Sequence, residues 1–225
     1  KDYDCGVISA GALLQYLLET QKNQLSHMTH ITPYTTGKYM MLDSSTRRNL
    51  ELCETLREKQ KRGSLLWVLD KTRTAMGART LRKYIEQPLI EKAEILRRLD
   101  TVDELKEQAI TREEIREYLS PVYDLERLIT RITYGTANPR DLTAFAGSLS
   151  MLPPLSYLLQ EMKAPLLQEI YQEMDPLEDL CALVQQAIAD EPPIAMKEGN
   201  IIRDGYSEEV DTLRRAKSDG KSWLA

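Results

Sequence analysis

The stretch 65–88, LLWVLDKTRTAMGARTLRKYIEQP, constrains the fold of this chain more than any other segment. Apolar and small residues recur in it at the spacing of one helix face, namely Met76, Gly77, Thr80, Leu81, Tyr84 and Ile85. Basic residues fall on the opposite face, and Pro88 predicts the end of the helix. The pattern predicts a short apolar element over 65–69, a tight polar turn, and an amphipathic helix that packs deep in the protein.

Gly77 is on the predicted buried face of this helix. Glycine in a helix interior is less favourable than alanine by about 1 kcal/mol, so its presence needs a physical reason. We predict that another backbone approaches closely at this point. Thr72 or Thr74 is expected to cap the start of the helix.

Helical periodicity recurs along the rest of the chain, interrupted by proline, glycine and capping residues. Asp43 is a predicted cap, and Asn138 followed by Pro139 predicts another helix start. Residues 24–38 show no period and are expected to form a linker. About ten helices are expected, over 7–23, 44–56, 76–87, 91–108, 111–119, 125–135, 138–152, 155–161, 164–174, 176–188 and 208–225.

These patterns predict an all-α protein, an irregular multi-helix bundle with a protruding C-terminal helix. The single Phe and the scarcity of β-branched runs argue against a β-rich core. Two features favour a fragment of a longer protein. Only residues 1–6 precede the first helix, and the mostly polar helix from Ser207 has no capping signal at its end.

Composition excludes several classes of protein. The net charge of −5 argues against a basic nucleic-acid module, and no apolar run approaches the ~20 residues of a membrane span. The N-terminus shows no signal-peptide pattern, and three widely spaced Cys argue against a disulfide framework. A cytoplasmic protein is expected. Charge is uneven, at +4 over 63–83 and −7 over 161–200, which indicates either opposed basic and acidic faces or ordinary solvated helices.

No catalytic, cofactor-binding or metal site is predicted. The chain contains no P-loop, GxGxxG, HExxH or CxxC motif. His27 and His30 form an HxxH pair, but it lies in the expected linker without Cys ligands nearby. A basic cluster could meet phosphate, although non-specific surface charge is the better interpretation: Arg47, Arg48, Arg79, Arg82 and Lys83.

Four blocks in order carry a family resemblance. They are LDSSTRRNLEL (42–52), SLLWVLDKTRTAMGARTLRKYIEQPL (64–89), YDLERLITRITYGTANPRDL (123–142) and EGNIIRDGYSEEVDTLR (198–214). Together they resemble the core of the bacterial DNA mismatch repair family MutS. GALLQYLLETQK (11–22) resembles the last helix of the connector domain of that family.

The resemblance implies a domain organisation. Residues 1–27 would hold the last connector helix and the start of a linker, 28–206 the first segment of the helical core, and 207–225 the start of a lever helix leading to a clamp. The mismatch-reading domain, the clamp, the returning lever and the ATPase domain have no matching positions here. Family residues for DNA and ATP are therefore not transferred to this chain.

The implied role is mechanical. The parent would be an ATPase that uses ATP and Mg, binds mismatched double-stranded DNA as a homodimer, and acts with a MutL-type repair partner. This segment would couple the ATPase, clamp and mismatch-reading domains and would itself bind DNA weakly or not at all. Its predicted structural hub is Met76, Gly77, Leu81 and Ile85.

Two rival interpretations remain open from the sequence. One is a free-standing helical protein-interaction module that docks a partner through its acidic or basic face. The other is an autonomous DNA-binding domain, against which the net charge argues.

Overall fold

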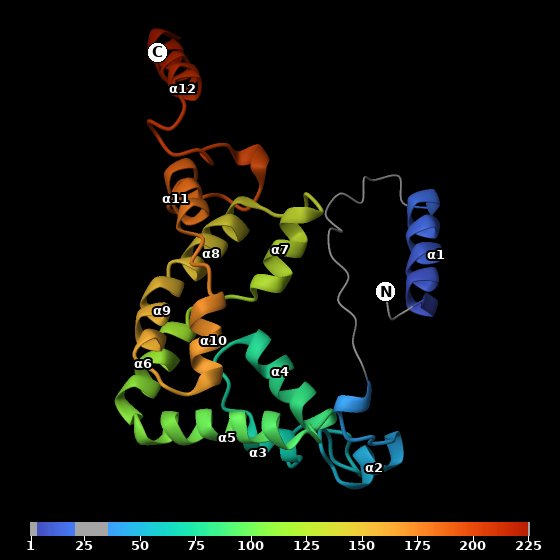
Figure 1. Cartoon of the computed structure of the whole chain (residues 1–225). Coiled ribbons are helices and arrows are strands. Elements are labelled where there is room, and N and C mark those ends of the chain that lie inside the picture. Colours follow the sequence, from blue (N-terminus) through green and yellow to red (C-terminus); the bar gives the residue numbers. More distant parts are fainter. Residues whose placement is uncertain (1–3, 21–35, 225) are drawn as a thin grey trace. The chain divides into compact units, whose positions relative to one another are not determined.

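The computed structural model describes residues 4–20 and 36–224, which divide into two units, 1–36 and 37–225 (Figure 1). The described part is helical, which confirms the predicted all-α fold class. Its extended pairing is limited to two isolated antiparallel bridges, Tyr39 with Leu89 and Ile188 with Ile202. The short turn η1 (Thr36–Lys38) spans the boundary between the two units. The second unit contains the short turn η2 (Met196–Glu198) and the helices α2 (Ser44–Asn49), α3 (Leu65–Leu69), α4 (Ala75–Glu86), α5 (Lys92–Glu107), α6 (Ala109–Leu119), α7 (Leu125–Thr133), α8 (Pro139–Leu149), α9 (Leu152–Gln160), α10 (Pro165–Glu173), α11 (Glu178–Ala187) and α12 (Glu208–Leu224).

The first unit contains helix α1 (Asp4–Thr20), where the sequence predicts a helix over 7–23. Its large apolar side chains are mostly exposed, including Val7 and Ile8. Most of the predicted linker over 24–38 lies outside the described residues, as do His27 and His30.

One core lies between α7, α8 and α11. Leu128, Phe145, Leu149 and Cys181 are buried together with Ala146. Asn138 caps α8 through a capping box with Asp141, and Pro139 occupies the first turn. This arrangement matches the start predicted for the helix. The buried thiol of Cys181 behaves as a small apolar side chain, and burial raises its pKa.

A second core joins α5, α6, α9 and α10. Leu159, Met162, Ala164 and Leu167 are buried in it, and Leu105 packs against them from α5. A carboxylate also joins these helices, because both oxygens of Glu104 accept backbone N–H bonds at the start of α10. The distances are 2.7 Å from Lys163 N and 2.6 Å from Ala164 N. Glu104 thus acts as a long-range cap for a helix that begins 61 residues later.

Several apolar faces that helical periodicity alone would place inward are exposed. Ile95, Leu99 and Val102 of α5 are 37%, 55% and 61% exposed. The side of α5 that meets the second core carries Glu104 and Leu105 instead. Helix α2 is shorter than predicted: Asp43 caps it as expected, but it ends at Asn49 and leaves Leu50 exposed.

The prediction that no apolar run approaches the length of a membrane span is wrong for one stretch of the α8–α9 region. Pro139–Gln160 is 22 residues long with a mean hydropathy of 1.3, enough to span a membrane by length and composition. The stretch is broken after Leu149, and α9 begins at Leu152 with prolines in its first turn. Its apolar residues Phe145, Leu149 and Leu159 contribute to the two cores.

Helix α12 carries a largely exposed surface between 208 and 217 and extends from the end of the body beyond α11 (Figure 1). This matches the predicted protruding C-terminal helix. Its start is fixed locally, since Gly205 N donates to Asp211 and Arg214 donates to the carbonyl of Ile202 at 2.8 Å.

Candidate functional site

The predicted hub helix α4 begins directly after a capping threonine, as the sequence predicts. Thr74 is its N-cap, and the Thr74 hydroxyl accepts the N–H of Gly77 at 3.0 Å. Ser64 caps the preceding α3 in the same way, accepting from Trp67 N at 3.2 Å. The short apolar element, the polar turn and the helix ending before Pro88 all follow the prediction.

The predicted depth of α4 is wrong. None of its residues is buried, and Met76, Gly77, Leu81 and Ile85 are only partly buried. Tyr84, also assigned to the inner face, is 42% exposed. The amphipathic pattern is therefore present in the helix, but within the described chain its apolar face is only partly covered.

The prediction of a close backbone neighbour at Gly77 is also wrong. A Cβ atom added there would lie 3.1 Å from Thr74 Oγ1 and 3.5 Å from Thr72 Cβ, and both of these are side-chain atoms. Gly77 is the third residue of α4, directly over the capping hydroxyl. The glycine leaves room for the cap that starts its own helix.

The charged face of α4 makes a bidentate contact with the start of α7. Arg79 binds Asp124 with both terminal nitrogens, at 2.7 and 2.8 Å, and its Nη2 lies 2.5 Å from Glu126 Oε2. Asp124 is also the N-cap of α7. Hydrogen bonding from Arg79 lowers the pKa of Asp124 and raises that of the guanidinium, because both groups are stabilised in their charged forms.

Two further contacts connect α4 to its surroundings. Arg98 of α5 stacks over the Tyr84 ring, 3.6 Å from its centroid. Glu86 accepts from Arg82 Nε at 2.9 Å and from the Cys53 thiol at 3.4 Å. Burial, followed by the bond to Glu86, raises the pKa of Cys53.

Residues 88–90, which follow α4, form a backbone pairing with the segment before α2. Met40 N donates to the Pro88 carbonyl at 2.8 Å, and Ile90 N donates to the Lys38 carbonyl at 3.3 Å. Helix α4 therefore connects to α5, α7 and the 38–53 region through polar groups.

The predicted basic cluster divides in the structure. Arg79 and Arg82 are neutralised by carboxylates, and Arg47 Nε donates to the Leu42 carbonyl at 2.9 Å. Within the described residues, Arg48 and Lys83 form no ion pair. The cluster does not present five free cations to a phosphate.

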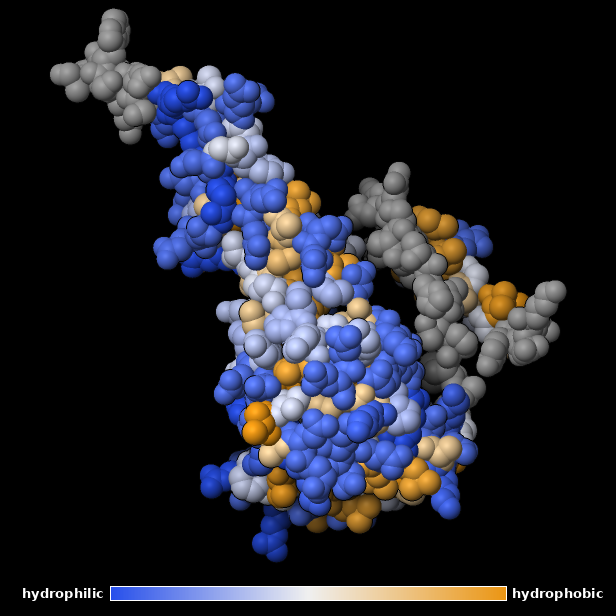
Figure 2. All heavy atoms as spheres, turned by 60° about the vertical axis from the view of Figure 1, so that its left-hand side comes forward, coloured by the Kyte–Doolittle hydropathy of each residue, from blue (hydrophilic) through white to orange (hydrophobic). Residues whose placement is uncertain are grey.

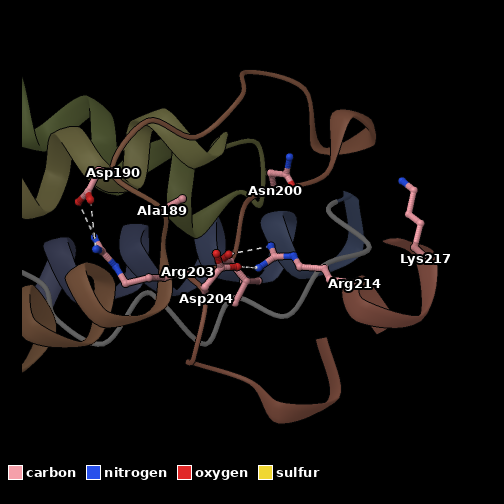
Figure 3. Close-up of a pocket in the computed structure, with 8 residues that line it drawn as sticks. Ala189, Asp190, Asn200, Arg203, Asp204, Arg214 and Lys217 are labelled. Carbon is pink, nitrogen blue, oxygen red and sulfur yellow. Dashed lines mark hydrogen bonds and ion pairs between the residues drawn. The ribbon is translucent and has the colours of Figure 1, made fainter. Parts of the chain in front are cut away.

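A second candidate site lies at the base of α12, in a cavity of about 740 Å³ (Figure 3). Arg203 pairs with Asp190, with Nη1 3.1 Å from Oδ2 and Nη2 2.5 Å from Oδ1, and this contact lowers the pKa of Asp190. Arg214 of α12 pairs with Asp204, while Lys217 stands apart from both pairs. The charged groups brace the start of α12 against the end of α11 and leave no uncommitted carboxylate pair for acid–base chemistry.

Among the residues that the structure describes, no group of three or more His, Cys, Asp or Glu side chains is placed to hold a metal ion. Two contacts between helices are not predicted from the sequence, Arg79 with Asp124 and Glu104 with the start of α10. Asp124 before an apolar run is a recognisable capping signal. Its partner 45 residues away leaves no signal in a single sequence.

The helical fold, with polar contacts around α4 and at the base of α12, defines an all-α domain whose described residues contain no recognisable reaction centre. Comparison with known proteins specifies the class further. The family profile described as MutS domain III matches residues 45–219, so the chain belongs to the MutS family and contains the domain III region.

Relatives named DNA mismatch repair protein MutS support this assignment. The protein from Lachnoclostridium phytofermentans is 64% identical over 225 residues, all of this chain and 24% of the relative. The protein from Acetivibrio thermocellus is 52% identical over 223 residues, 99% of this chain and 26% of the relative. The chain thus spans about a quarter of the length of these curated relatives.

Proposed function

We propose that this segment couples the nucleotide-binding and DNA-binding parts of a mismatch repair ATPase of the MutS family. The parent would bind mismatched double-stranded DNA as a cytoplasmic homodimer, use ATP and Mg in a domain outside this chain, and act with a MutL-type partner. The segment itself takes no part in the chemistry. Its proposed limits are a connector end at 1–27, the core at 28–206 and the lever start at 207–225.

The observation that carries the proposal is the set of polar contacts around α4. Arg79 binds α7, Tyr84 meets α5, and the backbone after Pro88 pairs with residues 38–40. A helix connected in three directions cannot shift without moving its neighbours or breaking these bonds. We retain Met76, Gly77, Leu81 and Ile85 as proposed hub residues, in a hub held by polar contacts with only partial burial.

The experiment compares two variants of the full-length parent, one with an arginine replaced by glutamine and one with a lysine replaced by glutamine. Arg79→Gln removes the contact with Asp124, and Lys83→Gln removes a neighbouring exposed charge of α4 as the matched control. We expect Arg79→Gln to keep ATP hydrolysis and mismatch binding when each is measured alone. It should weaken the ATP-dependent change in DNA binding, measured as release from a mismatched duplex.

An unchanged ATP response in Arg79→Gln would contradict coupling through this contact. The Gly77→Leu variant gives a second test, because its side chain would displace the Thr74 cap. Unchanged stability and an unchanged ATP response in that variant would remove the hub assignment.

A further inference from the structure

The five residues of α3, Leu-Leu-Trp-Val-Leu, are all apolar. A helix that is apolar on every side belongs in a protein interior. Only Leu66 is buried here, while Leu65, Trp67, Val68 and Leu69 are 44%, 48%, 56% and 49% exposed. We refer to these four exposed residues as the α3 face. Figure 2 shows apolar surface at the lower end of the molecule, the end at which Figure 1 places α3.

The α3 face is held rigidly in its exposed position. Ser64 caps the helix and is fully buried, and backbone bonds join Leu65 N to the Glu51 carbonyl at 3.1 Å and Leu66 N to the Leu52 carbonyl at 2.8 Å. An ion pair between Lys61 and Asp70 spans the two ends of the helix at 2.5 Å. The exposure is therefore a property of an anchored helix and does not come from a fraying end.

Basic residues flank the α3 face on both sides in the sequence. Residues 57–73 contain six Lys or Arg against Glu58 and Asp70, and Asp70 is engaged by Lys61. The remaining basic side chains all lie on exposed residues without an ion pair in the described part of the chain: Arg57, Lys59, Arg62, Lys71 and Arg73. An apolar patch with a basic rim is complementary to a protein segment that carries apolar residues flanked by Asp or Glu.

We propose that the α3 face docks an apolar, acid-flanked segment of the same polypeptide that lies outside residues 1–225. Relatives that match the whole chain are about four times as long, which leaves ample chain to supply such a segment. A nucleic acid would satisfy the basic rim but leave four apolar side chains without a partner, so a protein segment fits better. The proposal concerns a contact surface and is independent of the coupling function above.

Two measurements on the full-length parent test the proposal. Hydroxyl-radical labelling measures how fast the Trp67 side chain is modified in the folded protein, relative to its modification rate in the urea-unfolded protein. The buried Phe145 (9% exposed) is the internal reference. Carbodiimide then joins Lys amines directly to carboxylates, and mass spectrometry locates the links. We expect protection of Trp67 close to that of Phe145, together with links from Lys59 or Lys71 to Asp or Glu outside residues 1–225 of the same molecule.

A Trp67→Glu variant tests the contact directly, because a carboxylate on the α3 face would repel an acidic partner segment. It should abolish these links while leaving protection of Phe145 unchanged. Labelling of Trp67 near the unfolded rate would overturn the proposal. So would links only to Glu19 of α1, links only between two molecules, or protection of Trp67 that arises only after DNA is added.

Discussion

The helices around Leu149 and the helix α4 are held in different ways. Leu149 is 2% exposed in a core shared by α7, α8 and α11, whereas α4 has no buried residue and is held by Arg79, Tyr84 and backbone pairing. Apolar burial is strong and non-directional, while ion pairs at partly exposed sites are weak and geometrically specific. The first kind of contact packs helices into one body, and the second connects α4 to its neighbours in specific directions.

The largest expected effect tests the packed body. Leu149→Ala should lower the free energy of unfolding of the 225-residue chain by about 2–5 kcal/mol, through lost burial and the cavity left behind. Leu99→Ala is the control, since Leu99 is 55% exposed on α5. Its effect should stay within about 0.5 kcal/mol. Equal losses in urea unfolding of the two variants would contradict the difference in burial.

The next effect concerns a single carboxylate that joins two helices of the second core. Glu104→Ala removes the acceptor of Lys163 N and Ala164 N and should destabilise the chain by roughly 1.5–3 kcal/mol, as expected for hydrogen bonds to a charged group. Glu107→Ala, at an exposed position of the same helix, should change little. Similar unfolding midpoints for the two variants would show that Glu104 has no capping role.

A smaller effect tests the polar junction of α4. In a double-mutant cycle of Arg79→Gln and Asp124→Asn, asparagine preserves the capping oxygen of α7 and removes only the charge. We expect a small favourable coupling that decreases as NaCl is added, because Arg79 is 42% exposed and salt screens the pair. The cycle with Lys83→Gln in place of Arg79→Gln should give no coupling. A salt-independent value would indicate packing in place of an ion pair.

The smallest effect is a pH dependence next to α3. Hydrogen bonding from Lys61, and then from Thr72, lowers the pKa of Asp70 to about 2. Because the folded pKa lies below the unfolded value of about 3.9, this stabilisation is present above pH 4 and is lost as the pH falls toward 2. Melting temperatures of wild type and Asp70→Asn should differ at pH 6 and converge near pH 2. A difference that persists at pH 2 would exclude this cause.

The sequence by itself determined the local structure. Helix starts at Asp43, Thr74 and Asn138 could be predicted because a capping side chain and the backbone N–H that donates to it lie within three residues of each other. The stop before Pro88 is equally local. The all-α class and the MutS family followed from these periodicities and from the four ordered blocks, and the family profile confirmed the family.

Only the tertiary structure decided which faces are covered and which charges pair. Helical periodicity shows that Leu99 and Val102 share a face of α5, but the covering of that face depends on segments distant in sequence. The sequence alone is equally consistent with a solvent-exposed Arg79. Only the folded chain places Asp124, 45 residues further on, beside it. Pairing between residues distant in sequence depends on how the whole chain folds. For that reason α4, predicted to pack deep in the protein, has no buried residue and is held by Arg79, by the Arg98–Tyr84 contact and by the backbone pairing that follows it.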